Sequence, residues 1–333
     1  MNIDKILDND TQLLALTGLY RGEFDELLTA FSPRWTQAFK HFDLRGRRRK
    51  RPLTPRQIEK NTKALGGEAT KLFFILNHFK VNAIQQNEAL SFDLDQPQVS
   101  RWIKLLTPVL HQSIVDLHCQ AARTTDDLVR LFRNRQHLDS AVPKPATTTL
   151  SADGTERPLS RNVDYEAQKF DYSGKHKAHT IKNTVVSDEM HFIHFLGYTW
   201  RGAIHDKAMI EQELPDFTHV VFDRQTLLKD TGYQGYNPDG IALLQPMKKN
   251  KGIKLTPLQK RFNTWISSMR VVVEQAIGGM KRLRVLVDRT RGFTTNKFDD
   301  AIKIGAGLHN LRVTRRKTTY PGTLDRIRAN FLA

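Results

Sequence analysis

The sequence predicts an all-helical N-terminal region followed by an α/β domain, and three observations support this fold class. Apolar residues recur at helical spacing from about residue 70 to residue 106. Short apolar strands separated by polar turns begin near residue 148, and a long helical pattern opens near residue 256. The chain has 333 residues, of which 39% are hydrophobic, so its length suits about two folded domains and its composition argues against disorder.

The charge balance indicates a polyanionic partner. Lys and Arg number 52 against 35 Asp and Glu, a formal net charge of +17. Such an excess favours nucleic acid, with an anionic membrane surface as the weaker alternative. The N-terminus lacks the apolar core of a signal peptide, and the longest apolar run, 72–76, is far too short to cross a bilayer. Cys119, the only cysteine, excludes an intramolecular disulfide and a Cys-rich zinc site. We therefore expect a protein of a reducing, cytoplasmic compartment with no membrane partner.

Residues 1–65 are expected to form short amphipathic helices followed by a basic arm. The arm has six cations in seven residues: Arg45, Arg47, Arg48, Arg49, Lys50 and Arg51. A mobile solvated linker and an ordered element both fit this composition. Either could neutralise DNA phosphates.

Residues 66–140 show the layout of a helix-turn-helix DNA-binding domain. Asp95 and Gln98 have capping-box spacing at the start of the last helix, and Val99, Trp102 and Leu106 form its apolar stripe. The remaining positions of that helix include Gln96, Gln98, Ser100, Arg101 and Lys104, which have the donors and acceptors that contact base edges and phosphates. A plain helical bundle with a solvated face would explain the pattern in a neutral protein. The charge balance favours DNA binding.

The α/β domain is expected over residues 147–315, with a basic tail at 316–333. Predicted strands lie at 148–152, 177–185, 191–196, 226–228 and 241–244, and a helix at 206–214. A longer helix opens with a Thr256–Gln259 capping box, has Pro257 at its first position, and runs to about Leu283. Strands followed by helices in this order predict an α/β layout.

Three acidic residues stand at core elements of this domain and are the candidate metal ligands. Asp153 and Asp230 follow predicted strands, and Glu274 lies in the middle of the long helix. Converging carboxylates repel each other unless a cation joins them, and Mg²⁺ takes carboxylates together with substrate phosphates. Two such ions can clamp both oxygens of a phosphodiester displacement. Asp223, after Val220–Phe222, is the rival for the second acid, and Asp206 is better explained as a helix cap.

The long helix adds two cations to this candidate site. Arg270, Glu274 and Lys281 fall in one narrow sector of the helix, at the edge of its apolar stripe. Arg270 and Lys281 could hold a phosphate while Glu274 holds the metal. A plain Arg–Glu pair four residues apart is the simpler alternative.

These motifs together resemble the DDE transposases of bacterial insertion sequences, of the insertion-sequence-5 type, which are related to Harbinger-type endonucleases. Arg270, Glu274 and Lys281 resemble the family's R-(3)-E-(6)-K signature, Asp153 its D-G-T and Asp230 its D-x-G-Y-x-G. Tyr172–Lys175 is similar to its Y-S-G-K hairpin, and Gly202–Asp206 to its G-x-x-H-D segment. Ser267 departs from the family pattern, which often has tyrosine there, and Asp93 stands where the turn often has glycine.

The resemblance implies a ribonuclease-H-like fold for the α/β domain and DNA cleavage that depends on Mg²⁺, with Mn²⁺ as a substitute and two ions at the site. It also implies binding of terminal inverted repeats, attack of the freed 3′-hydroxyl on target DNA, and at least a homodimer in the synaptic complex at the bacterial nucleoid. Lys175 and Lys177, in and beside the hairpin, would then contact DNA. The alternative is a catalytically silent DNA-binding regulator or architectural protein on the same scaffold.

Overall fold

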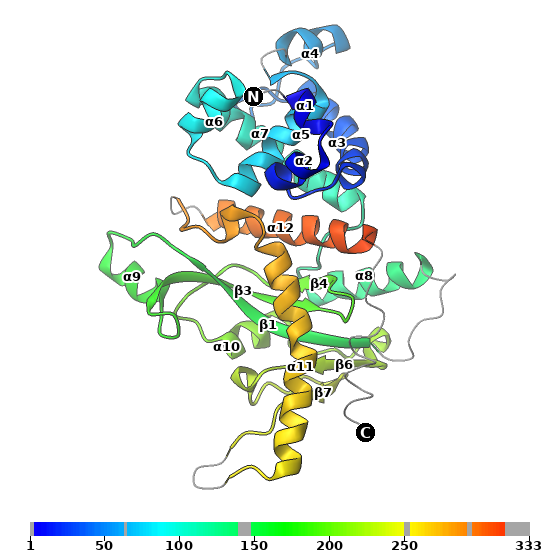
Figure 1. The fold of residues 1–333 in the computed structure, drawn as a ribbon, viewed down its shortest axis with the longest axis vertical. Helices are drawn as coiled ribbons and strands as arrows, with labels where there is room; N and C mark the ends of the chain where they lie inside the picture. Colours follow the sequence, from blue (N-terminus) through cyan, green and yellow to red (C-terminus); the bar gives the residue numbers. More distant parts are fainter. Residues whose placement is uncertain (1–2, 63–64, 139–147, 250–253, 292–294, 317–333) are drawn as a thin grey trace. The chain divides into compact units, whose positions relative to one another are not determined.

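A computed structural model describes residues 3–62, 65–138, 148–249, 254–291 and 295–316. The chain divides into two compact units (Figure 1). Unit 1 comprises Met1–Gln120, Met280–Asp288 and Asn296–Arg315, and unit 2 comprises Ala121–Gly279, Arg289–Thr295 and Arg316–Ala333. Each unit is described by itself below.

Unit 1 is helical. Its elements are α1 (Ile3–Leu7), α2 (Asp10–Thr17), α3 (Arg21–His41), α4 (Pro55–Thr62), α5 (Glu68–Val81), α6 (Gln85–Phe92), α7 (Gln96–Asp116), η4 (Arg284–Leu286) and α12 (Thr295–Arg315). Trp35 and Phe39 of α3 stack at 4.9 Å, and Trp35 lies 5.6 Å from Trp102 of α7. These buried rings join α3 to α7, so the predicted recognition helix packs on a helix that precedes the predicted domain.

The C-terminal helix α12 also belongs to unit 1. The Asn310 side chain donates a hydrogen bond to the Cys119 carbonyl, and Arg315 pairs with Glu26 of α3. Ile114 of α7 lies where a side chain at Gly307 would stand. Residues 296–315 therefore pack with the helical unit, whereas the sequence analysis assigned them to the α/β domain.

Unit 2 is a sheet with helices on both faces. Its elements are α8 (Thr125–Leu138), β1 (Thr148–Pro158), α9 (Tyr165–Asp171), β2 (Tyr172–Ser173), β3 (Ala178–Ser187), β4 (Ile193–Leu196), β5 (Trp200–Arg201), α10 (Asp206–Glu213), η2 (Val220–Phe222), β6 (Gln225–Leu228), η3 (Thr231–Tyr233), β7 (Ala242–Leu244) and α11 (Pro257–Met280). The strand order is β2-β3-β1-β6-β7, with β4 and β5 also pairing with β3. Strand β1 is antiparallel to β3 and parallel to β6, which is parallel to β7.

Alternation along β1 and β6 determines which residues face which helices. Leu150 and Ala152 of β1 pack with Ile210 of α10 and Phe132 of α8 in one core cluster. Leu228 of β6 packs on the other face, against α11, which crosses the sheet in Figure 1. Because neighbouring residues of a strand point to opposite faces, the position after Ala152 faces α11.

The structure confirms the mixed α/β architecture, the helical N-terminal region and both capping boxes. Three details differ from the sequence predictions. Helix α3 has 21 residues, longer than the short helices expected there, and α11 ends at Met280. Strand β1 continues to Pro158 because it pairs with β3 as far as Thr180, so Asp153 lies inside the strand.

The predicted basic tail falls outside the described residues from residue 317 onwards. Among the helices that are described, none is both long and apolar enough to cross a membrane.

Candidate active site

Asp153 lies in the middle of the sheet, on the face covered by α11. It is paired with Val185 of the neighbouring strand β3, and its carboxylate accepts a hydrogen bond from the Gly154 N–H at 2.8 Å. Burial raises the pKa of the Asp153 carboxyl, with that hydrogen bond and Arg270 acting in the opposite direction. The negative charge of Asp230 raises this pKa further. A cation at this position would therefore relieve a real electrostatic cost.

Asp230 occupies the equivalent place on the neighbouring parallel strand. Ser151 of β1 is paired with Leu228 of β6, and Asp153 and Asp230 each stand two residues further along the chain. Asp230 caps η3 by accepting from the Thr231 N–H at 2.6 Å, and its carbonyl accepts from the Gln245 side chain at 2.8 Å. The two aspartates thus stand at corresponding positions of neighbouring parallel strands.

Arg270 of α11 joins the two aspartates. One guanidinium nitrogen lies 3.1 Å from Asp230 Oδ1, and another lies 4.0 Å from Asp153 Oδ2. The Arg270 side chain is 14% exposed, against 23% for Asp153 and 37% for Asp230. Two carboxylates therefore share one largely buried cation.

Asp223 and Asp206 hold different positions. Asp223 is exposed and ends η2, before β6 begins at Gln225, so it lies at the opposite end of β6 from Asp230. Asp206 is the first residue of α10, whose N-cap is His205. The predicted capping role of Asp206 is wrong, because its carboxylate pairs with buried Lys182 at 3.1 Å.

Glu274 does not pair with the aspartates among the described residues. Glu274 is exposed on α11, one turn beyond Arg270, and makes no ion pair or side-chain hydrogen bond with any described residue. Lys281 follows the last residue of α11 and belongs to unit 1. The structure therefore brings together Asp153, Asp230 and Arg270 from the predicted set.

Lys175 lies in the turn between β2 and β3, within electrostatic range of Asp153, and it lowers the pKa of that carboxyl. The next residue, His176, is 3.6 Å from Glu156 of β1, so the turn folds back along β1. Lys175 and Lys177 are both exposed. The charge of Lys175 is available to an anionic ligand beside Asp153.

The arrangement fits a divalent cation in part. Two carboxylates that already share a cation provide the one or two protein ligands that Mg²⁺ commonly takes besides phosphates and water. Within the described residues, no three His, Cys, Asp or Glu side chains lie close enough together to hold a metal ion. The third acid, Glu274, would have to turn toward the aspartates for a three-carboxylate site to form.

Sequence reasoning missed an ion network and a phenol beneath the aspartates. Buried Lys182 lies between Glu156 at 3.3 Å and Asp206 at 3.1 Å. Asp206 presses against β1, since a Cβ on Gly154 would stand 3.3 Å from its carboxylate. The available signal was that two charged residues, Lys182 and Glu156, stand within strands that have largely buried positions.

Tyr233 is the phenol. It is 2% exposed, and its hydroxyl finds no hydrogen-bond partner among the described residues. Burial first, and then the charges of Asp153, Asp206 and Asp230, raise its pKa well above the usual tyrosine value. The ring therefore stays neutral and keeps its O–H proton next to the acidic cluster.

The candidate recognition residues of unit 1 lie along α7. Asp93 adopts the left-handed conformation (φ 54°) between α6 and α7, which an aspartate tolerates. Gln98 completes the capping box with Asp95, and Gln96 donates to Gln85 at 2.6 Å. Ser100 and Lys104 are exposed and Arg101 is half-buried. Two of the five candidate side chains thus already have intramolecular partners.

The basic arm is an ordered turn after α3. Phe42 forms a β-bridge with Arg48, and the Arg49 N–H donates to the His41 carbonyl. The Arg49 guanidinium stacks over Phe39 at 4.9 Å, and Arg47 pairs with Asp43 at 3.1 Å. Arg45, Arg48, Lys50 and Arg51 are exposed. Of the two alternatives left open by the sequence, the structure supports the ordered element.

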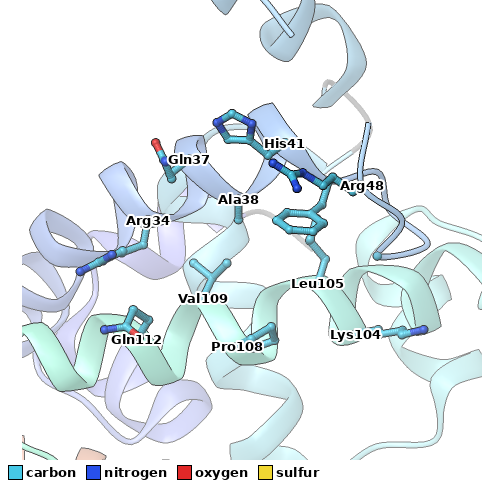
Figure 2. A pocket seen from close by; sticks show the side chains of 12 residues that line it. Arg34, Gln37, Ala38, His41, Arg48, Lys104, Leu105, Pro108, Val109 and Gln112 are labelled. Atoms are coloured by element: carbon cyan, nitrogen blue, oxygen red, sulfur yellow. The ribbon is translucent and has the colours of Figure 1, made fainter. Parts of the chain in front are cut away.

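A groove of about 700 Å³ is lined by residues of α3, of the arm and of α7 (Figure 2). Its floor includes Ala38, Leu105 and Val109, and its rim includes His41, Arg48 and Lys104. Arg48 of the arm and Lys104 of α7 therefore line one cavity. This positive rim unites the two predicted DNA-binding elements on one surface.

Comparisons with known proteins match the part of the chain that carries this site. Residues 152–310 match the family of DDE superfamily endonucleases, a range that contains Asp153, Asp230, Arg270, Glu274 and Lys281. The chain is 30% identical over 159 residues to a probable transposase for insertion sequence element IS702 of Microchaete diplosiphon. That match covers 47% of this chain, and the chain spans 55% of the length of the relative. No solved structure matches the chain.

The resemblance to DDE transposases of insertion sequences is confirmed by both matches. The endonuclease domain of the matched family is ribonuclease-H-like. The mixed α/β sheet of unit 2, with β1 antiparallel to β3 and parallel to β6, is in keeping with that class.

Proposed function

We propose that the chain is a DNA transposase. It would bind the terminal inverted repeats of a transposon, cleave DNA strands with divalent metal ions, and join the 3′-hydroxyl ends to target DNA. The observation that carries this proposal is the meeting of Asp153 and Asp230 around one cation at equivalent positions of two parallel strands. The formal charge of +17 supplies the attraction for DNA.

Asp153, Asp230 and Glu274 would hold the metal, Mg²⁺ or in its place Mn²⁺, at two positions. Bound there, the ions would supply Lewis-acid stabilisation of the phosphodiester and activation of the attacking oxygen. Arg270 would then exchange its aspartate partners for a phosphate oxygen, which its planar guanidinium can grip with two hydrogen bonds. Lys175 would hold the DNA strand beside Asp153, and Lys281 would contact a phosphate.

Unit 1 would recognise the transposon ends. The α6–turn–α7 segment would act as a helix-turn-helix, with Ser100, Arg101 and Lys104 in the major groove. Gln96 and Gln98 would have to leave their partners to read bases. The arm, next to Lys104 in the α3–α7 groove, would add contacts with phosphates that do not depend on sequence.

Holding two transposon ends at once requires at least two active sites, so we propose a homodimer or a larger assembly in the synaptic complex. An enzyme with this substrate would act at the bacterial nucleoid.

A plasmid-cleavage assay with and without Mg²⁺ tests the function. We expect nicking of a plasmid that carries the transposon ends, dependent on metal and lost in Asp153→Asn, Asp230→Asn and Glu274→Gln. All three variants should keep end binding measured in EDTA. Cleavage that persists in the three variants, or in EDTA, would contradict the proposal.

A catalytically silent DNA-binding protein is the second candidate. The observation that favours it is the position of Glu274, which lies outside the Asp153–Asp230 pair and makes no ion pair or side-chain hydrogen bond with a described residue. End binding by the wild-type chain without any metal-dependent cleavage would support this alternative.

A further inference from the structure

One stretch of unit 2 combines a long absence of acids with many cations. Between Asp239 and Glu274 the sequence has no Asp or Glu, while Lys or Arg stands at 248, 249, 251, 254, 260, 261 and 270. This stretch includes β7 and the first half of α11. The described cations other than Arg270 are exposed, and none of them pairs with an acid among the described residues.

We propose that Lys248 and Lys249, together with Lys260 of α11, form a binding track for the backbone of duplex DNA next to the Asp153–Asp230 site. The track would bind phosphates without regard to sequence. This inference rests on the proposed function and names a contact surface for its DNA substrate.

The two parts of the track are joined by one side chain. The Asn263 carboxamide of α11 accepts from the Met247 N–H at 2.8 Å and donates to the Met247 carbonyl at 2.9 Å. This pair of bonds fixes the chain before Lys248 against α11. Lys260 lies three residues before Asn263, so cations from both segments belong to one surface.

The track begins beside Asp230. The Lys229 N–H donates to the Leu244 carbonyl at 3.1 Å, and the Gln245 side chain donates to the Asp230 carbonyl at 2.8 Å. The chain then continues through Met247 to Lys248. A phosphate backbone that passes Asp230 therefore meets these lysines next along the protein surface.

Charge identifies the ligand. Exposed cations with no neighbouring acid repel one another, and the negative charge of a polyanion relieves this repulsion. Release of the counterions condensed on the polyanion then favours binding. Lysine suits this role because its ammonium is a point charge that does not need one fixed geometry. Duplex DNA is the polyanion that the proposed reaction already requires at Asp230.

Salt dependence of DNA binding tests the track directly. Full-length protein with Lys248→Gln, Lys249→Gln and Lys260→Gln would be titrated with a random-sequence duplex in EDTA, over a series of salt concentrations. Each lost phosphate contact should lower the slope of log K against log salt by about 0.9, so the triple variant should lose between about two and three units of slope. The corresponding Lys→Arg triple variant should have the slope of the wild type.

A matched control removes the same charge elsewhere in unit 2. Arg130 and Arg133 lie on α8, which packs on the opposite face of the sheet from α11, and Arg224 precedes β6. All three are exposed, and Arg→Gln at these positions should change the slope by less than one unit. An equal loss in both triple variants would overturn the track, because it would report net charge alone.

Crosslinking locates the DNA. Cys119 is the only cysteine and is 2% exposed, so Lys248→Cys introduces one reactive thiol for a photoactivatable crosslinker. We expect adducts within about ten base pairs, one helical turn, of the cleavage point, and none from Arg130→Cys. Adducts spread evenly along the duplex, or absent, would refute the proposed position even if the enzyme cleaves normally. If the wild-type chain cleaves no DNA but the slope change is found and the crosslinks are confined to one helical turn of a bound end duplex, the track stands and the proposed function fails.

Discussion

The guanidinium of Arg270 lies 3.1 Å from the carboxylate of Asp230 and 4.0 Å from that of Asp153, so the two acids share this one cation. Burial first, and then the charge of Asp230, raise the pKa of the Asp153 carboxyl, so a cation beside the two acids favours their charged forms. A divalent ion bound by the same carboxylates would compete with this arginine. The geometry therefore couples metal binding to the position of Arg270.

Replacing Arg270 with Gln should strengthen binding of Mn²⁺ by about tenfold, since losing a competing ion pair worth roughly 1.4 kcal/mol has that effect. Strand cleavage should fall, because the phosphate loses its bidentate partner. Titration of Mn²⁺ followed by electron paramagnetic resonance measures the first effect. Arg270→Lys keeps the charge and should bind Mn²⁺ as the wild type does. Weaker Mn²⁺ binding by Arg270→Gln would show that the arginine supports the metal site.

Asp230 should be the second metal ligand. Asp230→Asn should reduce metal-dependent cleavage by about a hundredfold or more, since a Lewis acid supplies several kcal/mol and each 1.36 kcal/mol is tenfold. Asp223→Asn should stay within about twofold of wild type because Asp223 precedes β6 and Asp230 follows it. With Fe²⁺ in place of Mg²⁺, hydroxyl-radical cuts should cluster at Asp153 and Asp230. Cuts at Asp223 that survive Asp230→Ala would give the role to Asp223.

Much of unit 2 could be predicted because strand and helix patterns there are local. The alternation ending at Val185 predicted β3, and the Thr256–Gln259 spacing predicted the start of α11. The end of β1 could not be predicted in this way. It depends on pairing of Pro158 with Thr180, a partner distant in sequence.

The positions of charged side chains were harder to predict than the elements that carry them. The helical period placed Arg270 and Glu274 on one sector, yet Arg270 is largely buried between two acids and Glu274 is exposed. The difference arises because Asp153 and Asp230 supply charge opposite Arg270, a tertiary fact that periodicity does not contain. The order of the basic arm likewise depends on Phe39, beneath Arg49.

Arg101→Ala should lower the preference of the protein for end sequence over random duplex, by about 1–3 kcal/mol if the guanidinium contacts a base. Arg48→Ala should weaken binding to both duplexes alike and flatten the dependence of the binding constant on salt, because the arm contacts phosphates. Gln98→Ala is a poorer probe, since it also breaks the capping box with Asp95. Competition binding with the two duplexes measures these effects. If Arg101→Ala lowers the affinity for both duplexes equally, α7 is not the recognition helix.

Lys71 of α5 should make the stability of unit 1 depend on pH above neutrality. It is 2% exposed, with its ammonium 5.1 Å from the ring centre of Trp35 and 5.9 Å from that of Trp102. It also donates to the carbonyls of Gly66 and Gly67. Burial lowers the pKa of this amine to about 8, whereas a lysine in an unfolded chain titrates near 10.4.

The sign of the effect follows from which state holds the proton. Between about pH 8 and pH 10.4 the unfolded chain keeps the proton on Lys71 and the folded chain releases it, so the stability contributed by this group rises with pH in that window. Urea unfolding at pH 7.5, 9 and 10, followed by tryptophan fluorescence, should show this rise as a difference between wild type and Lys71→Met. The subtraction removes other groups that titrate there, and Lys80→Met, another lysine whose pKa burial lowers, serves as the control for a partly buried amine. If the difference in the free energy of unfolding between wild type and Lys71→Met stays flat or falls from pH 7.5 to pH 10, the ring and carbonyl contacts of Lys71 outweigh its burial.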